Sequence, residues 1–262
     1  MSESVSFDRA ADFYDATRAL PDDVAAQLTE ALLAELAHIG TDRVLEVGVG
    51  TGRISRPLME RGIRVHGVDI SAAMMRTLHQ QLGSGHLAPD LLLGDATRLP
   101  VASDSVPAAL MVHILHLVSS MPEAISEVAR VLKPRGVLLH ATTREPDESP
   151  WQASADIWAE ALAPHGFERR RRPETEDIHA ALNAQGATVR VEQYTTSEER
   201  STPQQHLDLA RNRIHSWSWE YPDDLFAEVF AEYEPKYQTH YGDLDRELTE
   251  THIHELEVWT FP

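Results

Sequence analysis

The sequence predicts an α/β fold built around a largely parallel sheet. Between residues 43 and 143, short runs of β-branched and aliphatic residues alternate with segments of helical periodicity. Strands separated by helices of this length are typical of β-α-β units, whose crossovers make the strands parallel. A glycine-rich turn follows the first strand and a carboxylate ends the second, which indicates a ligand site at one edge of the sheet.

The expected elements follow from the spacing of apolar residues. Residues 22–38 predict a helix, because apolar residues recur every three or four positions and Gly40 follows the last of them. Further helices are expected over residues 53–61, 72–82, 121–132, 151–163 and 174–185. Strands are expected over residues 43–47, 64–69, 91–93, 106–112, 136–143, 187–195 and 253–261. A helical block over about 203–240 separates the last two strands, so we expect those strands to pair antiparallel at the sheet edge.

Composition narrows the class of protein. The chain of 262 residues is long enough for one large domain with a proper core. A formal net charge of −19 would repel a phosphate backbone, which argues against a nucleic-acid partner. Cysteine is absent, which excludes disulfides and thiolate metal sites. No apolar run approaches the roughly 20 residues of a membrane span and no signal peptide is evident, so we expect a cytoplasmic protein.

The strongest motif is VLEVGVGTGR, residues 44–53. Gly48, Gly50 and Gly52 follow a strand that ends in Glu46 and Val47, and glycines allow a close approach of backbone to ligand. A nicotinamide dinucleotide fingerprint would place its third glycine at position 53, which is Arg53. A merely tight turn between strand and helix remains the alternative.

Two aspartates stand at the ends of the next two strands. Asp69 lies about twenty residues after the glycine loop, where a carboxylate can accept hydrogen bonds from both hydroxyls of a ribose. The alternative is that Asp69 caps the helix that starts at Ser71. Asp95, in GDATRLP, follows a short strand and could also face the ligand site. The alternative is that Asp95 is an ordinary aspartate in a turn.

In this order and spacing, the motifs resemble the class I S-adenosylmethionine-dependent methyltransferases, in the small-molecule branch of UbiE-like and type 11 enzymes. The stretches DSVPAALMVHILHLVSS and SEVARVLKPRG are similar to that family's fourth strand, following helix and turn into the fifth strand. The resemblance implies a Rossmann-like sheet of seven strands flanked by helices, with the last strand antiparallel and a helical lid inserted. It covers residues 40–143 firmly and residues 1–40 more weakly.

The resemblance also implies S-adenosyl-L-methionine as cofactor and supplies the roles of its contacts. The glycine loop would pass under the methionine part, Asp69 would bind the ribose, and Asp95 would bind the adenine amino group while the next backbone N–H binds a ring nitrogen. The implied contacts in this region are Glu46, Gly48, Gly50, Gly52, Asp69, Ile70, Met74, Asp95 and Ala96.

The N-terminal stretch looks like the opening helix that covers the cofactor in many small-molecule methyltransferases. Tyr14 and Arg18 lie four residues apart on one helical face, and Arg18 could pair with the cofactor's carboxylate. The alternative for Arg18 is a surface arginine near acidic neighbours. We therefore expect a single domain with three parts. Residues 1–40 would form helices that cover the cofactor, residues 41–145 the cofactor-binding core, and residues 146–262 the remaining strands and the lid.

His113 and His116 lie just past the fourth strand, where open α/β sheets bind ligands. A hydroxyl or amine acceptor must lose a proton, and an imidazole is a suitable base, so both histidines are candidate catalytic residues. The alternative is that they pack under the lid or bond a backbone carbonyl. His252 and His254 are expected to lie on one face of a strand without binding a metal, and no metal site is predicted.

The aromatic residues of the late helical block would form the apolar lid, with ordinary packing of an extra helical layer as the alternative. They are Trp217, Trp219, Tyr221, Phe226, Phe230, Tyr233 and Tyr237.

The sequence therefore predicts a methyltransferase acting on a small-molecule acceptor, as a monomer or homodimer, without nucleic acid or membrane as partner. The main alternative is a non-catalytic protein that binds S-adenosylmethionine and keeps the fold. A nicotinamide oxidoreductase is disfavoured by Arg53.

Overall fold

The computed structural model describes residues 4–8, 14, 20–82, 89–146, 149–168 and 171–262. The chain divides into two compact units, each assembled from separate stretches. The sheet unit comprises Met1–Thr143, Arg172–Thr195 and His254–Pro262, and the helical unit comprises Arg144–Arg171 and Thr196–Ile253. The helical unit falls within the part of the chain where the sequence predicts an insertion. That the two units act as one domain stays a prediction.

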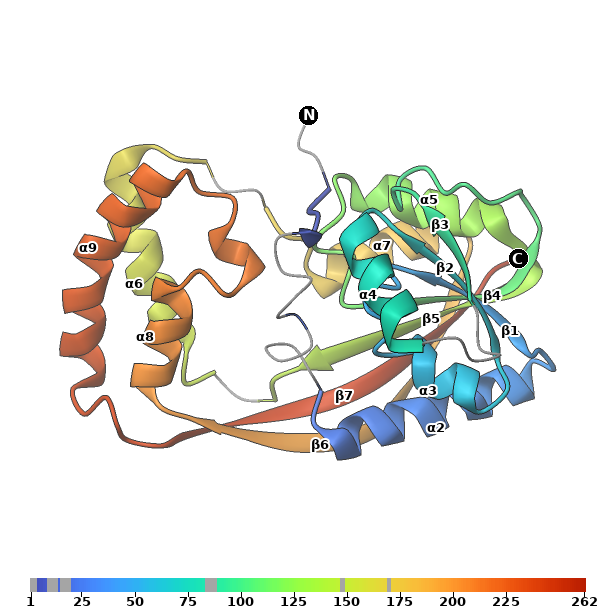
Figure 1. Cartoon of the computed structure of the whole chain (residues 1–262), viewed down its shortest axis with the longest axis horizontal. Helices are drawn as coiled ribbons and strands as arrows, with labels where there is room; N and C mark the ends of the chain where they lie inside the picture. The colour runs from blue at the N-terminus through green and yellow to red at the C-terminus, as the bar shows by residue number, and fades with distance from the viewer. Residues whose placement is uncertain (1–3, 9–13, 15–19, 83–88, 147–148, 169–170) are drawn as a thin grey trace. The chain divides into compact units, whose positions relative to one another are not determined.

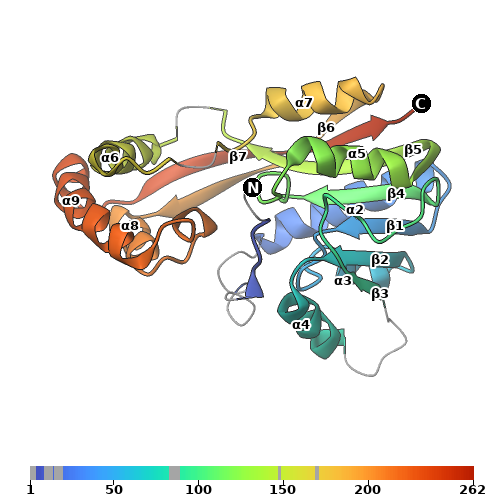
Figure 2. The ribbon, with the colours of Figure 1, turned by 90° about the horizontal axis from the view of Figure 1, so that it is seen from above.

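A seven-stranded sheet forms the centre of the sheet unit, in the order β3-β2-β1-β4-β5-β7-β6 (Figure 1). Its strands are β1 (Arg43–Val47), β2 (Arg64–Asp69), β3 (Asp90–Leu93), β4 (Val106–Val112), β5 (Leu132–Arg144), β6 (Thr188–Ser201) and β7 (Leu248–Thr260). The first five strands pair parallel to their neighbours. Figure 2 shows β7 running opposite to β5 and β6. The predicted class I methyltransferase fold, with its antiparallel last strand, is confirmed.

The strand order reverses between β1 and β4. From β1 the chain moves outward to β2 and β3, and it then returns to the other side of β1 to form β4. At such a reversal the connections after the two strands leave in opposite directions, which opens a crevice at the carboxyl ends of the strands. The loops after β1 and β4 therefore define where a ligand can enter the sheet unit.

Helices cover both faces of the sheet (Figure 1). The helices α2 (Asp22–His38) and α3 (Ser55–Glu60) lie on one face, and α5 (Met121–Val131) and α7 (Thr175–Ala184) lie on the other. Alternate residues of β4 serve the two faces: Leu110 packs with α2 and Met111 packs with α5. This two-sided burial explains why the strands are nearly continuous apolar runs in the sequence.

The helical unit has its own aromatic core. It contains α6 (Gln152–Leu162), α8 (Pro203–Arg211) and α9 (Asp223–Tyr241), together with the short 3-10 helices η2 (Ala163–His165) and η3 (Ser216–Ser218). Trp158 is buried at its centre, and its indole Nε1 donates a hydrogen bond of 3.1 Å to the Tyr221 hydroxyl. Buried around it are Tyr221, Phe226, Phe230, Tyr233 and Tyr237.

These five residues belong to the aromatic block that the sequence assigned to a lid. Their burial supports the alternative of ordinary packing, because side chains inside their own unit's core present no surface to a ligand. Trp217 and Trp219 are only partly buried, and a lid role for these two stays a prediction.

Local sequence explains where α8 begins. Thr202 and Gln205 form a capping box: the Thr202 side chain accepts from the backbone N–H of Gln205 at 3.2 Å, and the Gln205 side chain accepts from the backbone N–H of Thr202 at 2.9 Å. Pro203 occupies the first turn, where its missing N–H costs nothing.

Candidate active site

The glycine loop after β1 forms one wall of a cavity at the reversal point. Gly48 and Gly52 have φ values of 83° and 79°, in the left-handed region that favours glycine. A Cβ on Gly48 would lie 2.6 Å from Cγ2 of Ile114, and one on Gly52 would lie 2.3 Å from Cδ1 of Leu78. The absence of a side chain at these two glycines therefore allows the loop to pack closely against Ile114 and Leu78.

Gly50 differs from its two neighbours in the loop. The nearest atom to a Cβ built on Gly50 would be Cε of Met74, at 3.5 Å, which is an ordinary contact distance, so a Cβ here would not clash with the protein. Its backbone N–H donates a hydrogen bond of 2.8 Å to Oδ2 of Asp69. Gly50 thus presents bare backbone to the cavity, which suits a ligand that lies close to the loop.

Asp69 connects the glycine loop with the start of α4 (Ala72–Leu82). Besides the bond from Gly50, its Oδ1 accepts from the backbone N–H of Ser71 at 2.8 Å. Asp69 thus fixes the turn before α4, whereas the Ser71 hydroxyl caps the helix by accepting from the backbone N–H of Met74 at 3.1 Å. The carboxylate of Asp69 also lines the cavity. Burial raises the pKa of Asp69, opposed by the bonds from Ser71 and Gly50.

Glu46 is buried at the base of the same loop. Its carboxylate accepts a hydrogen bond from the Ser55 hydroxyl at the start of α3. Burial raises the pKa of Glu46 to about 8, although Ser55 and Arg53 act in the opposite direction. A neutral acid is thus held beside the cavity at neutral pH, and a nearby cation would favour its ionised form.

Asp95 and Ala96 lie after β3 at the far end of the cavity. Oδ1 of Asp95 accepts from the backbone N–H of Thr97 at 2.9 Å and from the Thr97 hydroxyl at 2.8 Å. These bonds make Asp95 a turn residue, as its alternative proposed. The Ser4 side chain also bonds to Asp95, and these hydrogen bonds outweigh burial and lower its pKa.

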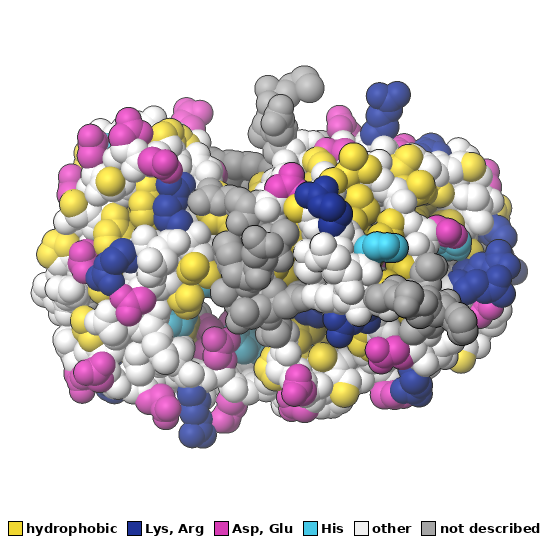
Figure 3. Space-filling model, viewed as in Figure 1, with side chains coloured by type: hydrophobic (Ala, Val, Ile, Leu, Met, Phe, Trp, Pro, Cys, Tyr) yellow, Lys and Arg dark blue, Asp and Glu magenta, His cyan; other side chains and the backbone are white. Residues whose placement is uncertain are grey.

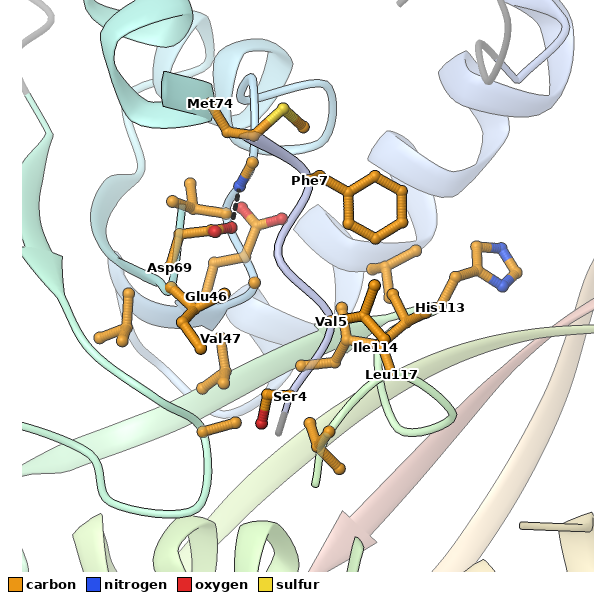
Figure 4. A pocket seen from close by; sticks show the side chains of 18 of the residues that line it. Ser4, Val5, Phe7, Glu46, Val47, Asp69, Met74, His113, Ile114 and Leu117 are labelled. Atoms are coloured by element: carbon orange, nitrogen blue, oxygen red, sulfur yellow. Dashed lines mark hydrogen bonds between the residues drawn. The ribbon is translucent and has the colours of Figure 1, made fainter. Parts of the chain in front are cut away.

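The N-terminal segment 4–8 runs through the cavity, which sequence reasoning missed. Figure 4 shows Ser4, Val5 and Phe7 between Asp69 on one side and Leu117 on the other. The backbone N–H of Val5 donates to the Leu117 carbonyl at 2.9 Å. The sequence predicted that residues 1–40 cover the cofactor, but no motif indicated that Val5 and Phe7 would lie inside the cavity.

The ends of segment 4–8 are also held in place. The Ser4 hydroxyl accepts from the backbone N–H of Ser119 at 2.9 Å. At the other end, Oδ1 of Asp8 accepts from the Ser71 hydroxyl at 2.6 Å and from the backbone N–H of Ala73 at 3.2 Å. Asp8 thereby supplies an acceptor to the first turn of α4.

The structure brings most of the predicted cofactor residues together. The cavity is lined by Tyr14, Glu46, Gly48, Gly50, Asp69, Ile70, Met74, Asp95 and Ala96. Gly52 lies behind the loop, against Leu78, and shapes the cavity without facing it. Arg18 lies outside the described residues.

His113 and His116 occupy different positions after β4. His113 lines the cavity and has a φ of 53°, a conformation that non-glycine residues rarely adopt. Figure 4 shows its ring pointing away from Asp69 and Glu46. His113 is an exposed residue, although much of the protein surrounds its ring. The loss of water around the ring is the main cause that lowers its pKa, and the basic side chains of Arg53 and His116 lower it further. His116 is partly buried and does not line the cavity among the described residues.

The residues present suit S-adenosylmethionine. The backbone of Gly50, the carboxylate of Asp69 and the apolar side chains of Ile70 and Met74 line the cavity and match a sugar joined to a flat base. With segment 4–8 in place, however, the cavity encloses about 100 Å³, whereas small-molecule sites usually span roughly 300–1,000 Å³. Segment 4–8 occupies part of the space that a nucleoside-sized ligand would need, and its displacement on binding is a prediction.

Comparison with known proteins agrees with this geometry. Residues 45–140 match the family model described as a methyltransferase domain, which confirms the resemblance recognised in the sequence. The malonyl-[acyl-carrier protein] O-methyltransferase of Serratia marcescens is 34% identical over 137 residues, covering 52% of this chain and 51% of that protein. The demethylmenaquinone methyltransferase of Renibacterium salmoninarum is 30% identical over 149 residues, covering 56% of this chain and 60% of that protein.

The chain thus spans about half the length of the curated relatives that it matches. Among solved structures, a putative sarcosine dimethylglycine methyltransferase from Galdieria sulphuraria aligns with a TM-score of 0.56 at 16% identity. That alignment covers 96% of this chain and 98% of the other, and at this identity it supports the fold alone. The sheet unit therefore carries a methyltransferase domain of the class I fold.

Proposed function

We propose that the protein is an S-adenosylmethionine-dependent methyltransferase that acts on a small-molecule acceptor. The observation that carries this proposal is the convergence of Gly50, Asp69 and Asp95 on one cavity within the matched methyltransferase domain. The two relatives named above act on different acceptors, as their names state, so similarity does not decide the acceptor of this chain.

S-adenosylmethionine supplies, when bound, a methyl group on a positively charged sulfur. The chain's own contribution is then to bind and align. Asp69 would hold the ribose hydroxyls, and its bond to Gly50 keeps the carboxylate and the loop in one geometry. Asp95 and Ala96 would hold the adenine edge, and Glu46 would favour a positive charge at the base of the loop. Alignment alone accounts for a large part of the acceleration in reactions of this kind.

His113 and His116 stay candidates for contact with the acceptor. The lowered pKa of His113 makes it a weak base, because a good general base has a pKa near the working pH. A role in binding an acceptor that needs no deprotonation therefore suits His113 better than proton removal.

Transfer of labelled methyl groups tests the proposal. The full-length protein is incubated with S-adenosylmethionine labelled in the methyl group and with fractionated small-molecule pools, and Asp69→Ala serves as the variant weakened in donor binding. We expect label in a low-molecular-weight product with the wild-type protein and less label with Asp69→Ala at a limiting concentration of donor. No label from any pool despite donor binding would favour a non-catalytic binding protein, and equal labelling by both proteins would remove Asp69 from the donor site. The cytoplasmic location and the absence of a nucleic-acid partner stay predictions.

The described part of the chain contains no helix that is both long and apolar enough to cross a membrane. On the face shown in Figure 3, acidic and basic side chains are interspersed.

A further inference from the structure

A second group of polar side chains lies beside the donor cavity, at the same edge of the sheet. It is formed by Arg53, His113, Tyr194 and His254, which we call the basic edge. All four belong to the sheet unit, although they come from the glycine loop, the loop after β4, β6 and β7. No motif in the sequence connects them.

The strand register explains how these residues meet. On β5, Ala141 pairs with Val112 of β4, so the next residues of β5 run beside His113. Thr143 Oγ1 and His254 Nδ1 share a hydrogen bond of 3.2 Å, which places the early part of β7 against the end of β5. The Tyr194 ring on β6 lies 5.9 Å from the His254 ring. Three neighbouring strands thus bring Thr143, His254 and Tyr194 together, and His254 lies within electrostatic range of His113.

Arg53 joins this group to the donor cavity. Its side chain lines the cavity together with His113. Its charge acts on both His113 and Tyr194, so it lies within electrostatic range of both. Burial raises the pKa of Tyr194 to about 12, and the hydroxyl is therefore a neutral donor at physiological pH.

Basic and acidic groups both lie near the basic edge. His113 is influenced by Arg53, His116, His140 and His254, all of which lower its pKa. The carboxylate of Asp69, which lines the same cavity, accepts from Gly50 and Ser71, and two further carboxylates are also engaged. Glu46 is bonded to Ser55, as described above.

Glu257, the second carboxylate, accepts from Trp259 Nε1 at 3.0 Å and bonds to His140 Nδ1 at 3.0 Å and His179 Nε2 at 2.7 Å. Burial raises the pKa of Glu257, but these three hydrogen bonds outweigh it and lower the pKa to about 2. Glu257 is therefore hydrogen-bonded within its own network.

We propose that the acceptor is a carboxylic acid whose carboxylate binds at the basic edge, between Arg53, His113 and His254. A guanidinium presents a fork that matches a carboxylate, and the imidazoles and the Tyr194 hydroxyl add further donors. A carboxylate also needs no general base, because it is already ionised at neutral pH. This inference rests on the proposed methyl transfer and names the acceptor class for it.

Binding of malonate to the full-length protein tests the proposal without any methyl transfer. The histidine ring resonances are followed by NMR in protein labelled with ¹³C-histidine, and His113 is assigned with His113→Asn. We expect malonate to shift the His113 resonance saturably and to raise the pKa of His113, because a bound anion favours the protonated ring. Malonamide, which has the same shape without charge, should produce no such shift.

Variants and a second anion make the result decisive. Arg53→Gln and, independently, His254→Gln should weaken malonate binding, with about a tenfold or larger loss for Arg53→Gln. Arg56→Gln, a nearby arginine that bonds to Gln81, is the matched control and should leave binding unchanged. The absence of a malonate shift, an equal shift with malonamide, or a shift with inorganic phosphate alone would overturn the proposal.

The same samples separate this inference from the proposed function. Binding of S-adenosylhomocysteine is measured in parallel on the wild-type protein. If the nucleoside binds and malonate does not, the methyltransferase proposal stands and the acceptor class is wrong. If malonate binds and the nucleoside does not, the anion site stands and the proposed function is wrong.

Discussion

The donor cavity and the basic edge share Arg53 and His113, but the two regions are built differently. Most of the donor cavity comes from one continuous stretch, residues 46–96, in which each strand ends in a turn that faces the ligand. The basic edge takes single side chains from four distant places in the chain. Backbone geometry thus shapes the donor cavity, whereas side-chain choice shapes the basic edge.

This difference teaches where substitutions should change affinity for the donor and where they should change the choice of acceptor. Backbone-shaped sites tolerate few changes, because glycine conformations and carboxylate caps support the fold as well as the ligand. A group of side chains on strand ends can vary with little cost to the sheet. We therefore expect losses of donor binding to concentrate between β1 and β3.

The largest effect is expected from Asp69→Ala. The substitution removes the carboxylate that joins Gly50 to Ser71 and faces the cavity. Donor affinity should fall by about 1–3 kcal/mol, because charged hydrogen bonds to the ligand are lost. Calorimetry with S-adenosylhomocysteine measures this loss. Asp90→Ala, at the exposed start of β3, is the control, and equal affinity in both variants would leave Asp69 as a turn residue only.

Glu46→Gln should change the pH dependence of stability. The folded pKa of Glu46 is raised to about 8 from 4.5, so its stabilising contribution is fully present below pH 4.5 and is lost as the pH rises through 8. The glutamine variant cannot ionise and should lack this decline. Above pH 8 it should exceed the wild-type free energy of unfolding by on the order of 1–3 kcal/mol.

Urea unfolding of the protein without ligand, at several pH values, measures this effect. Glu30→Gln is the control, because Glu30 is exposed and pairs with Arg61 on the surface. Parallel pH profiles for wild type and Glu46→Gln would contradict the assignment of Glu46 as a buried neutral acid.

His116→Ala probes the difference between proton removal and binding. If the acceptor is a carboxylate, turnover should fall only a few-fold, because no proton has to be removed. A general base would instead contribute about 10²–10⁴-fold. Turnover is compared with that of His38→Ala, an exposed histidine at the end of α2. A loss in the larger range would restore His116 as the base and weaken the case for a carboxylate acceptor.

Ser4→Ala is expected to have the smallest effect, and in the opposite direction. The Ser4 side chain bonds to Asp95 and to the backbone of Ser119 while segment 4–8 lies in the cavity. If the donor displaces these bonds when it binds, their removal should tighten donor binding by about 1 kcal/mol or less. Calorimetry against Ser6→Ala, which lies outside the lining of the cavity, checks the sign. Weaker binding in Ser4→Ala would show that segment 4–8 helps to hold the donor.

The contrast between the two regions also explains what could be predicted from sequence. Gly48, Asp69 and Asp95 follow strands with clear apolar runs, and parallel strands end at one edge, so their convergence was predictable. The basic edge was not, because the meeting of Tyr194 with His254 depends on how β6 and β7 join the sheet. The prolongation of β6 to Ser201 was missed because residues 196–201 are polar and poor in β-formers. The aromatic block was assigned to a lid because periodicity does not distinguish a unit's own core from a ligand surface.

The most direct test of the central claim is the ligand preference of the donor cavity. Calorimetry on the full-length protein should show S-adenosylmethionine and S-adenosylhomocysteine binding with a dissociation constant on the order of micromolar. NAD should bind much more weakly, since Arg53 occupies the position of the third glycine in a dinucleotide fingerprint. Equal or tighter binding of NAD would contradict the assignment of the cavity as a methyl-donor site.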